Sequence, residues 1–177
     1  MQYLYHVSEE SNIRVFRPRV PPTDSASPQS PVVWAVDRSH LPNYLVPREC
    51  PRVAFQSTET SSKEDEDRLL GLGGALHVVA IESTWFERAT GSTIWVYELA
   101  RETFSCFDAT AGYFVSAVAV SPISRRQLTN PIAELVRLGV ELRVVPSLLT
   151  LAKEVASSSL AFSCIRMRNA GGGPSAL

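Results

Sequence analysis

The residue best placed for chemistry near the amino-terminus of this chain is His6. It lies in the aromatic and apolar stretch 2–7, which is typical of a β-strand, and Ser8 follows directly. An imidazole at the end of a strand can donate a hydrogen bond to a ligand or act as a general base. We therefore treat His6 as a candidate for catalysis and ligand binding, and Ser8 as a candidate ligand-binding residue. A structural histidine satisfied within the sheet is the alternative.

A second group of polar side chains follows the apolar run 32–36. Asp37, Ser39 and His40 lie close together, and Tyr44 comes shortly after them. Loops at the ends of strands carry binding and catalytic groups more often than other segments do. A His–Asp pair could do acid–base work here, and the Tyr44 ring could stack on a flat ligand ring. The alternative is a turn capped by Ser39, with an ordinary half-buried tyrosine after it.

Arginine makes up fifteen of the seventeen basic residues, and six arginines fall within the first 52 positions. The planar guanidinium binds phosphate or carboxylate through two parallel hydrogen bonds, a geometry that lysine lacks. Four of these arginines are candidates to neutralise the phosphates of a ligand: Arg17, Arg19, Arg48 and Arg52. Arg48 is the most constrained, because prolines at positions 47 and 51 restrict the backbone on both sides. Solvated surface charge is the alternative for each of them.

The cysteines and histidines are too scattered to indicate a disulfide framework or a zinc site. We therefore predict no metal. Cys50 could serve as a nucleophile, but a lone cysteine is more often inert core, which is the interpretation we favour. Further along the chain, Asp108 and Ser116 are possible catalytic partners across the sheet, although their spacing follows no specific motif.

Length and composition restrict the class of protein. The chain has 177 residues, 45% of them hydrophobic, which suits a single globular domain with a real core. A net charge of −1 disfavours a DNA-binding protein, whose binding face is usually basic. No apolar run approaches the roughly 20 residues that a membrane helix needs, and the first residues do not resemble a signal peptide. We expect a cytoplasmic protein with a small-molecule substrate and no membrane partner, and the oligomeric state stays open.

Apolar periodicity and turn residues predict an α+β fold, because helices do not alternate regularly with strands. The predicted strands cover residues 2–7, 32–36, 52–56, 75–82, 93–99, 113–120, 141–145 and 160–167. The predicted helices cover residues 130–138 and 147–156, with shorter turns at 39–45 and 83–91. A single domain then spans residues 1–170, with an exposed mobile loop at 57–68 and a disordered tail at 171–177.

Five stretches spread along the chain form a recognisable pattern: LYHVSE (4–9), FRPR (16–19), VWAVD (33–37), YLVPRECPRV (44–53) and IRMRNA (165–170). This pattern resembles a family of small, mainly bacterial proteins of unknown function. The resemblance covers nearly the whole chain, and by itself it supplies no activity.

The order of the first elements is also similar to that of small ADP-ribosyltransferase-like proteins, such as rifamycin ADP-ribosyltransferases and tRNA 2′-phosphotransferases. This resemblance implies that NAD is the cofactor, that His6 holds its ribose, and that Tyr44 stacks on its nicotinamide. It also implies a third, acidic or polar residue on a later strand. The expected segment 113–120 contains no Asp or Glu, which leaves Asp108 and Ser116 for that role.

The sequence thus predicts a single α+β domain with a split, mostly antiparallel sheet around a cleft near the first strand. The resemblance implies an ADP-ribosyltransferase-like enzyme that binds NAD or a related phosphorylated ligand. One alternative is a cofactor-free isomerase, cyclase or hydrolase in which His6 or His40 works with Asp37 or Asp108. The other alternative is a non-catalytic ligand-binding domain.

Overall fold

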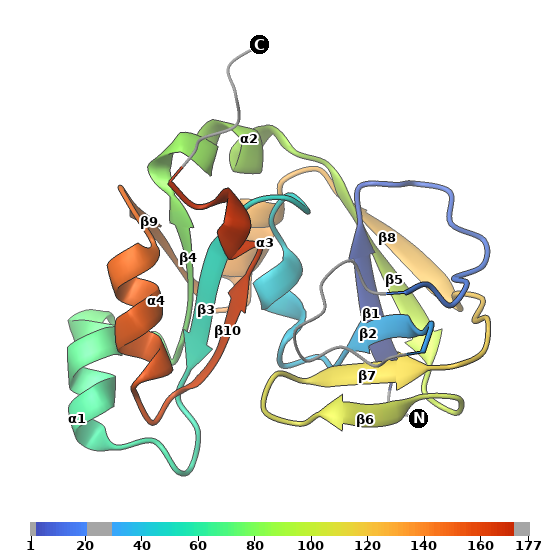
Figure 1. Ribbon diagram of the computed structural model, residues 1–177. Coiled ribbons are helices and arrows are strands. Elements are labelled where there is room, and N and C mark those ends of the chain that lie inside the picture. The colour runs from blue at the N-terminus through green and yellow to red at the C-terminus, as the bar shows by residue number, and fades with distance from the viewer. Residues whose placement is uncertain (1–2, 21–29, 172–177) are drawn as a thin grey trace. The chain divides into compact units, whose positions relative to one another are not determined.

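The structure of the chain, a computed structural model, describes residues 3–20 and 30–171 (Figure 1). Among these residues, ten strands form one sheet of six strands and one of four, accompanied by short helices. The predicted α+β class, with a split and mostly antiparallel sheet and a few short helices, is confirmed. The predicted disordered tail, apart from Gly171, lies outside the described residues.

Within this fold the chain forms two compact units. Unit 1 holds the chain up to Leu41 together with Ile94–Leu128, and unit 2 holds Pro42–Thr93 together with the chain from Thr129 onward. The chain therefore leaves unit 1 after its first two strands and returns to it for the remaining four.

Unit 1 is built on the six-stranded sheet, in which every strand pair is antiparallel and the order is β6-β7-β2-β1-β5-β8. Its strands are β1 (Tyr3–Ser8), β2 (Val33–Val36), β5 (Ile94–Ala100), β6 (Ser105–Asp108), β7 (Tyr113–Ser116) and β8 (Ser124–Leu128). β1 lies between β2 and β5, so its backbone is held on both edges. His6 stands opposite Tyr97 in the β1–β5 ladder.

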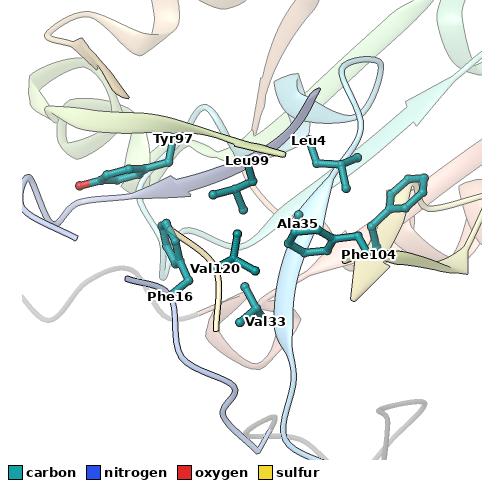
Figure 2. Close-up of a cluster of buried hydrophobic side chains, with 9 residues drawn as sticks. Leu4, Phe16, Val33, Ala35, Tyr97, Leu99, Phe104 and Val120 are labelled. Atoms are coloured by element: carbon teal, nitrogen blue, oxygen red, sulfur yellow. The ribbon is translucent and has the colours of Figure 1, made fainter. Parts of the chain in front are cut away.

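The core of unit 1 gathers on one face of this sheet (Figure 2). Leu4 and Leu99 stand opposite each other across β1 and β5, and Val33 and Ala35 are two positions apart on β2. Side chains two positions apart in a strand point to the same face, so alternation builds an apolar surface there. Burying one such side chain stabilises the fold by about 1.5–3 kcal/mol. The cluster consists of Leu4, Phe16, Val33, Ala35, Tyr97, Leu99, Phe104, Phe114 and Val120.

The segment of residues 9–19, which we call the strap, follows β1 and is tied back onto this unit. Phe16 contributes its ring to the core and exchanges two backbone hydrogen bonds with Val120, of 2.8 and 2.9 Å. Arg19 exchanges two backbone hydrogen bonds of 3.1 Å with Val32. These isolated bridges fix the strap at two points, three residues apart.

Unit 2 is built on the four-stranded sheet, in the order β10-β3-β4-β9. Its strands are β3 (Arg52–Gln56), β4 (His77–Glu82), β9 (Glu141–Val145) and β10 (Ala161–Ile165). The β4–β9 pair is parallel, and the other two pairs are antiparallel. The central strands β3 and β4 are almost entirely buried, as expected for strands covered on both faces.

The helical elements are all short. They are η1 (Leu41–Tyr44), α1 (Lys63–Asp65), the π-helical η2 (Glu66–Leu70), η3 (Gly71–Gly73), η4 (Ser83–Trp85), α2 (Phe86–Gly91), α3 (Pro131–Arg137), α4 (Leu149–Ala156) and η5 (Met167–Asn169). α3 begins as the sequence predicts, because the Asn130 side chain accepts a hydrogen bond from the Ala133 amide at 3.0 Å. α4 packs against β3 and β10, where Leu148 and Val155 join the core of unit 2.

The segment 57–68, predicted to be loop, contains helix in its second half, where α1 and η2 begin. Ser62 starts the helix, because its hydroxyl accepts a hydrogen bond from the Asp65 amide at 3.2 Å. Leu69 and Leu70 then bury themselves in the core of unit 2. The loop prediction was wrong there because it rested on the polar residues alone and ignored the two leucines that follow. The mobility of the segment stays a prediction.

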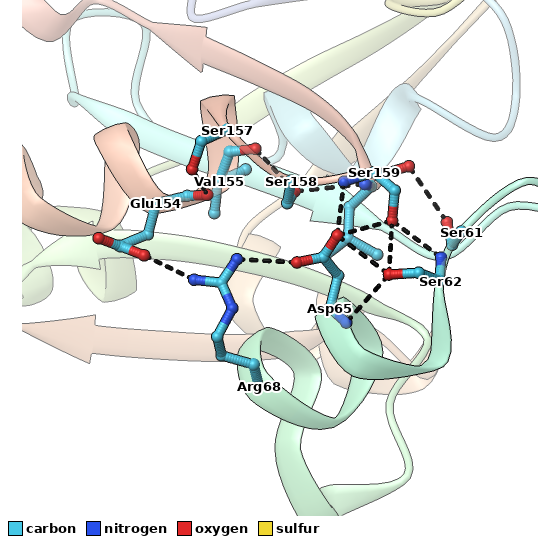
Figure 3. Close-up of polar contacts among 10 residues, drawn as sticks. Ser61, Ser62, Asp65, Arg68, Glu154, Val155, Ser157, Ser158 and Ser159 are labelled. Carbon is cyan, nitrogen blue, oxygen red and sulfur yellow. Dashed lines mark hydrogen bonds and ion pairs between the residues drawn. The ribbon is translucent and has the colours of Figure 1, made fainter.

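A polar network holds this helical segment against the turn between α4 and β10 (Figure 3). The Asp65 carboxylate accepts hydrogen bonds of 2.8 Å from the amide and from the hydroxyl of Ser159. Arg68 donates to Asp65 at 2.8 Å and to Glu154 at 2.6 Å. These bonds, with the guanidinium of Arg68 first among them, lower the pKa of Asp65 below its ordinary value.

Candidate functional site

His6 is held in a defined orientation on β1. Its Nδ1 lies 2.9 Å from the backbone carbonyl of Trp34, and because a carbonyl only accepts, Nδ1 must carry the proton of this bond. The half-buried ring also contacts the ring of Phe16, with 4.7 Å between centroids. Backbone and strap together therefore set both the tautomer and the tilt of this imidazole.

The binding residues predicted around His6 lie on the strap or at its start. Ser8 is buried, and its hydroxyl accepts a hydrogen bond from the Glu10 amide at 3.1 Å. Arg17 and Arg19 follow Phe16, and both side chains are exposed. In the part of the chain that the structure describes, no acidic group pairs with either guanidinium. Unit 1 thus combines an oriented histidine with a strap on which the predicted ligand-binding residues Arg17 and Arg19 are exposed.

The Asp37–His40 pair predicted after the second strand is present in the structure. His40 Nδ1 lies 2.8 Å from Asp37 Oδ1, and the Ser39 hydroxyl donates to the same oxygen at 2.8 Å. Burial by itself would raise the pKa of Asp37, but the hydrogen bonds from His40 and Ser39 outweigh it and hold the pKa below 3.8. His40 Nε2 lies 3.1 Å from the Thr110 carbonyl, so both ring nitrogens of this buried histidine face acceptors.

Gly112 provides the space for this pair and was not singled out by the sequence analysis. Its φ of +67° lies in the left-handed region, and a Cβ added there would overlap the His40 ring and approach Asp37 Oδ2 to 2.9 Å. Its carbonyl accepts a hydrogen bond from the Asp37 amide at 3.1 Å. The turn after β2 and the turn before β7 are therefore built as one structure. The only sequence signal was a glycine directly before a strand.

Asp108 and Ser116, the predicted partners for catalysis, both take part in turns. The exposed Asp108 accepts a hydrogen bond from the Ala111 amide at 3.0 Å. The buried Ser116 hydroxyl lies 3.1 Å from Thr103 Oγ1 and accepts a hydrogen bond from the Val118 amide at 3.3 Å. Both side chains therefore have a structural use, because each accepts a hydrogen bond from a backbone amide in a turn. A catalytic role for either stays a prediction.

In unit 2, the loop that carries Tyr44 and Arg48 is wound around a buried arginine. Arg52 Nε donates to the Asn43 carbonyl at 3.0 Å, and its Nη1 reaches the carbonyls of Pro47, Arg48 and Cys50 at 3.4, 3.2 and 2.9 Å. The guanidinium lies over the Tyr44 ring, 5.3 Å from its centroid. Arg52, a predicted phosphate-binding residue, thus has a structural use in the loop that its sequence context did not indicate.

The remaining candidates of this loop differ sharply in exposure. The Arg48 side chain is exposed, as a ligand-binding arginine must be. Cys50 is fully buried, and burial raises the pKa of its thiol to about 12. Because the thiolate is the nucleophilic form, this cysteine is inert core, in line with the favoured interpretation of the sequence.

The Glu49 carboxylate pairs with the carboxy-terminal segment of unit 2. It lies 3.4 Å from Arg166 Nε and 2.8 Å from Arg168 Nη2, and the Asn169 side chain donates to it at 3.2 Å. Arg166 has a φ of 56°, which is unusual for a residue other than glycine. The ion pairs of Glu49 thus lie within its own unit.

No group of three or more His, Cys, Asp or Glu side chains in the described part of the chain is arranged to hold a metal ion. None of its helices is long and apolar enough to cross a membrane.

Comparison with known proteins gives a single match. No curated protein and no solved structure matches the chain. The resemblance to ADP-ribosyltransferases therefore gains no support from these comparisons and stays a prediction. The model of one protein family, described as "Family of unknown function (DUF6886)", matches residues 5–170. This match spans almost the entire chain and agrees with the uncharacterised family indicated by the sequence pattern. The chain belongs to this family of unknown function.

Proposed function

We propose that unit 1 binds NAD or a related phosphorylated ligand beside His6, and that the protein is an ADP-ribosyltransferase-like enzyme. The observation that carries this proposal is the state of His6. Its Nδ1 is committed to the Trp34 carbonyl at 2.9 Å, and its ring is braced by Phe16. An oriented imidazole costs less entropy to engage than a freely rotating one, which favours recognition of a ligand hydroxyl.

The strap supplies the charge that such a ligand requires. A pyrophosphate carries negative charge that guanidinium groups neutralise well, through short charge-assisted hydrogen bonds. Arg17 and Arg19 are exposed on the strap, on the same unit as His6. Since no described acid occupies their guanidinium groups, both can turn toward an anion without breaking an ion pair.

The proposed reaction breaks the bond between the nicotinamide nitrogen and ribose C1′. Nicotinamide would leave with the electron pair of that bond, C1′ would develop oxocarbenium character, and a nucleophile of the small-molecule substrate would bond to C1′ and lose its proton. Electrostatic stabilisation of this centre would be the main contribution of the protein. By resemblance, Asp108 or Ser116 of the same unit orients the nucleophile. Tyr44 belongs to unit 2, so its predicted stacking on nicotinamide is not part of this proposal. Cytoplasmic location belongs to the same proposal, because the three cysteines are free thiols, which suits a reducing compartment.

Calorimetric titration with NAD tests the proposal, with AMP and inorganic pyrophosphate as partial ligands. The Arg17→Gln/Arg19→Gln double variant should bind NAD at least about tenfold more weakly, since one hydrogen bond to a charged group contributes about 1.5–3 kcal/mol. Arg38→Gln, an exposed arginine of unit 1 outside the strap, is the matched control and should bind NAD like the wild type. A wild-type protein that binds none of the three ligands, or a double variant with unchanged affinity, would refute the proposal.

A further inference from the structure

The hydroxyl of Tyr97 holds the strap from inside the core of unit 1. Tyr97 lies on β5 and has no solvent exposure. Its hydroxyl donates to the Glu10 carbonyl at 2.7 Å and accepts from the Ile13 amide at 3.2 Å. One buried side chain therefore satisfies two backbone groups of the strap at once, one as donor and one as acceptor.

The ring of Tyr97 continues this contact toward His6. It packs edge-on against the Phe16 ring, with 5.3 Å between centroids and an interplanar angle of 81°. Figure 2 shows these two rings side by side. The Phe16 ring in turn lies 4.7 Å from His6, which is the partner of Tyr97 in the β1–β5 ladder. The three rings form a continuous packed row from β5 through the strap to β1.

Other ties hold the strap at separate points and do not replace the hydroxyl. Ser8 holds the Glu10 amide, the Arg125 guanidinium contacts the Ser11 carbonyl, and Val120 pairs with Phe16. The stretch between Glu10 and Phe16 depends on Tyr97 for the two backbone bonds described above. Without the Tyr97 hydroxyl, the stretch before Phe16 loses its two hydrogen bonds to a buried side chain.

We infer that Tyr97 is a positioning residue for the His6 site. It sets the strap so that Phe16 braces the imidazole and so that Arg17 and Arg19 are presented on a fixed backbone. This inference rests on the proposed function only for the consequence on ligand affinity. The effect on the His6 ring follows from the packing alone.

Tyr97→Phe is the decisive variant, because it removes the hydroxyl and keeps the ring. Tyr113→Phe is the matched control, since Tyr113 lies on the same sheet and packs on Trp34 instead of the strap. We expect Tyr97→Phe to weaken NAD binding by about 3- to 10-fold, the equivalent of one ordinary hydrogen bond. We also expect it to shift the ring resonances of His6 in nuclear magnetic resonance spectra, because the Phe16 ring that contacts the imidazole would move. Tyr113→Phe should change neither quantity.

NAD affinity tests the proposed function, and the His6 resonances test the role of Tyr97. If wild-type protein binds no NAD, the proposed function fails, while the His6 resonances still decide the role of Tyr97. If Tyr97→Phe is folded but leaves the His6 resonances unchanged, the hydroxyl only stabilises the fold and the inference is wrong. Should Tyr97→Phe not fold, hydrogen exchange of the wild-type protein decides: the Ile13 amide, which donates to the Tyr97 hydroxyl, must be protected, and an Ile13 amide that exchanges as fast as an unbonded one overturns the inference.

Discussion

Replacing Arg52 by lysine should destabilise the protein through the loop that Arg52 organises. The guanidinium is buried, with 3% of the residue exposed, and donates to four backbone carbonyls of residues 43–50. Lysine keeps the positive charge and most of the apolar stem. It has a single nitrogen, however, and cannot reach both the Asn43 carbonyl and the carbonyls of the opposite side of the loop.

The magnitude follows from the bonds that lysine loses. The Nε bond to the Asn43 carbonyl, of 3.0 Å, disappears and leaves that carbonyl without its charged donor. One hydrogen bond to a charged group contributes about 1.5–3 kcal/mol. The planar contact with the Tyr44 ring is lost as well, and a cation–π contact contributes about 0.5–2 kcal/mol. We therefore expect Arg52→Lys to lower the free energy of unfolding by about 2–5 kcal/mol, a large share of the roughly 5–15 kcal/mol typical of a domain.

Urea unfolding followed by tryptophan fluorescence and circular dichroism measures this change. Arg48→Lys is the matched control, because the Arg48 side chain is exposed and its substitution should stay within about 0.5 kcal/mol of wild type. The slope of the transition should be the same for the three proteins. If Arg52→Lys unfolds at the wild-type urea concentration, or if Arg48→Lys is the more damaging change, the loop is not organised by Arg52 and this reasoning is refuted.

Three further outcomes are expected. Gly112→Ala should cost about 2–5 kcal/mol in thermal unfolding, because its left-handed φ adds strain and the new methyl overlaps the His40 ring. The pKa of Asp37 is lowered in the folded protein, so its stabilisation is present above its ordinary pKa of 3.8 and is lost as pH falls below it. Asp37→Asn should therefore lower the free energy of unfolding at pH 7, and this loss should shrink as the pH falls below 3.8 in urea unfolding. The thiol of Cys50, with a pKa of about 12, should resist alkylation by iodoacetamide at pH 8 in the native state and react after unfolding, as mass spectrometry can show.

A second glycine and a second cysteine of the chain serve as controls for the Gly112 and Cys50 predictions. Gly91→Ala adds a methyl where nothing lies within 4 Å and should be nearly neutral in the same thermal scan. The exposed Cys106 should be alkylated in the native protein under the conditions that spare Cys50. An Asp37→Asn protein that loses as much stability at pH 3 as at pH 7, or a Gly112→Ala protein as stable as wild type, would contradict the account of the Asp37–His40 pair.

The sequence predicts the buried strands well because their residues alternate or are continuously apolar. β1, β3 and β5 lie within a residue or two of the predicted stretches 2–7, 52–56 and 93–99. The edge strands β6 and β8 escaped prediction because their side chains are mostly exposed and polar, so only pairing with a neighbour makes them strands. Residues 113–120 were predicted as one strand, but β7 ends at Ser116. There the Ser116 hydroxyl accepts a hydrogen bond from the Val118 amide, and the chain turns.

Individual site residues were recognisable by type, but their partners were not. His6 and Arg52 are held by backbone carbonyls of Trp34 and of the 43–50 loop, and every residue carries such a carbonyl. A sequence contains no mark that tells which carbonyl will face a given side chain. The same holds for the Thr110 carbonyl at His40, which depends on the turn that Gly112 permits. Side-chain chemistry can therefore be read in advance, while the backbone that orients it needs the fold.

The division of unit 1 between two stretches of chain has a consequence for biosynthesis. β1 and β2 emerge from the ribosome first, but β5, the other neighbour of β1, begins only at Ile94. At synthesis rates of roughly 5–20 residues per second, the intervening residues 42–93 take about 3–10 s to appear. During that time the aromatic β1 has an open edge and no strand to close it, so the nascent chain is most prone to wrong pairing before unit 1 can form. Chaperone capture of stalled chains should accordingly be strongest for those that end between these two points.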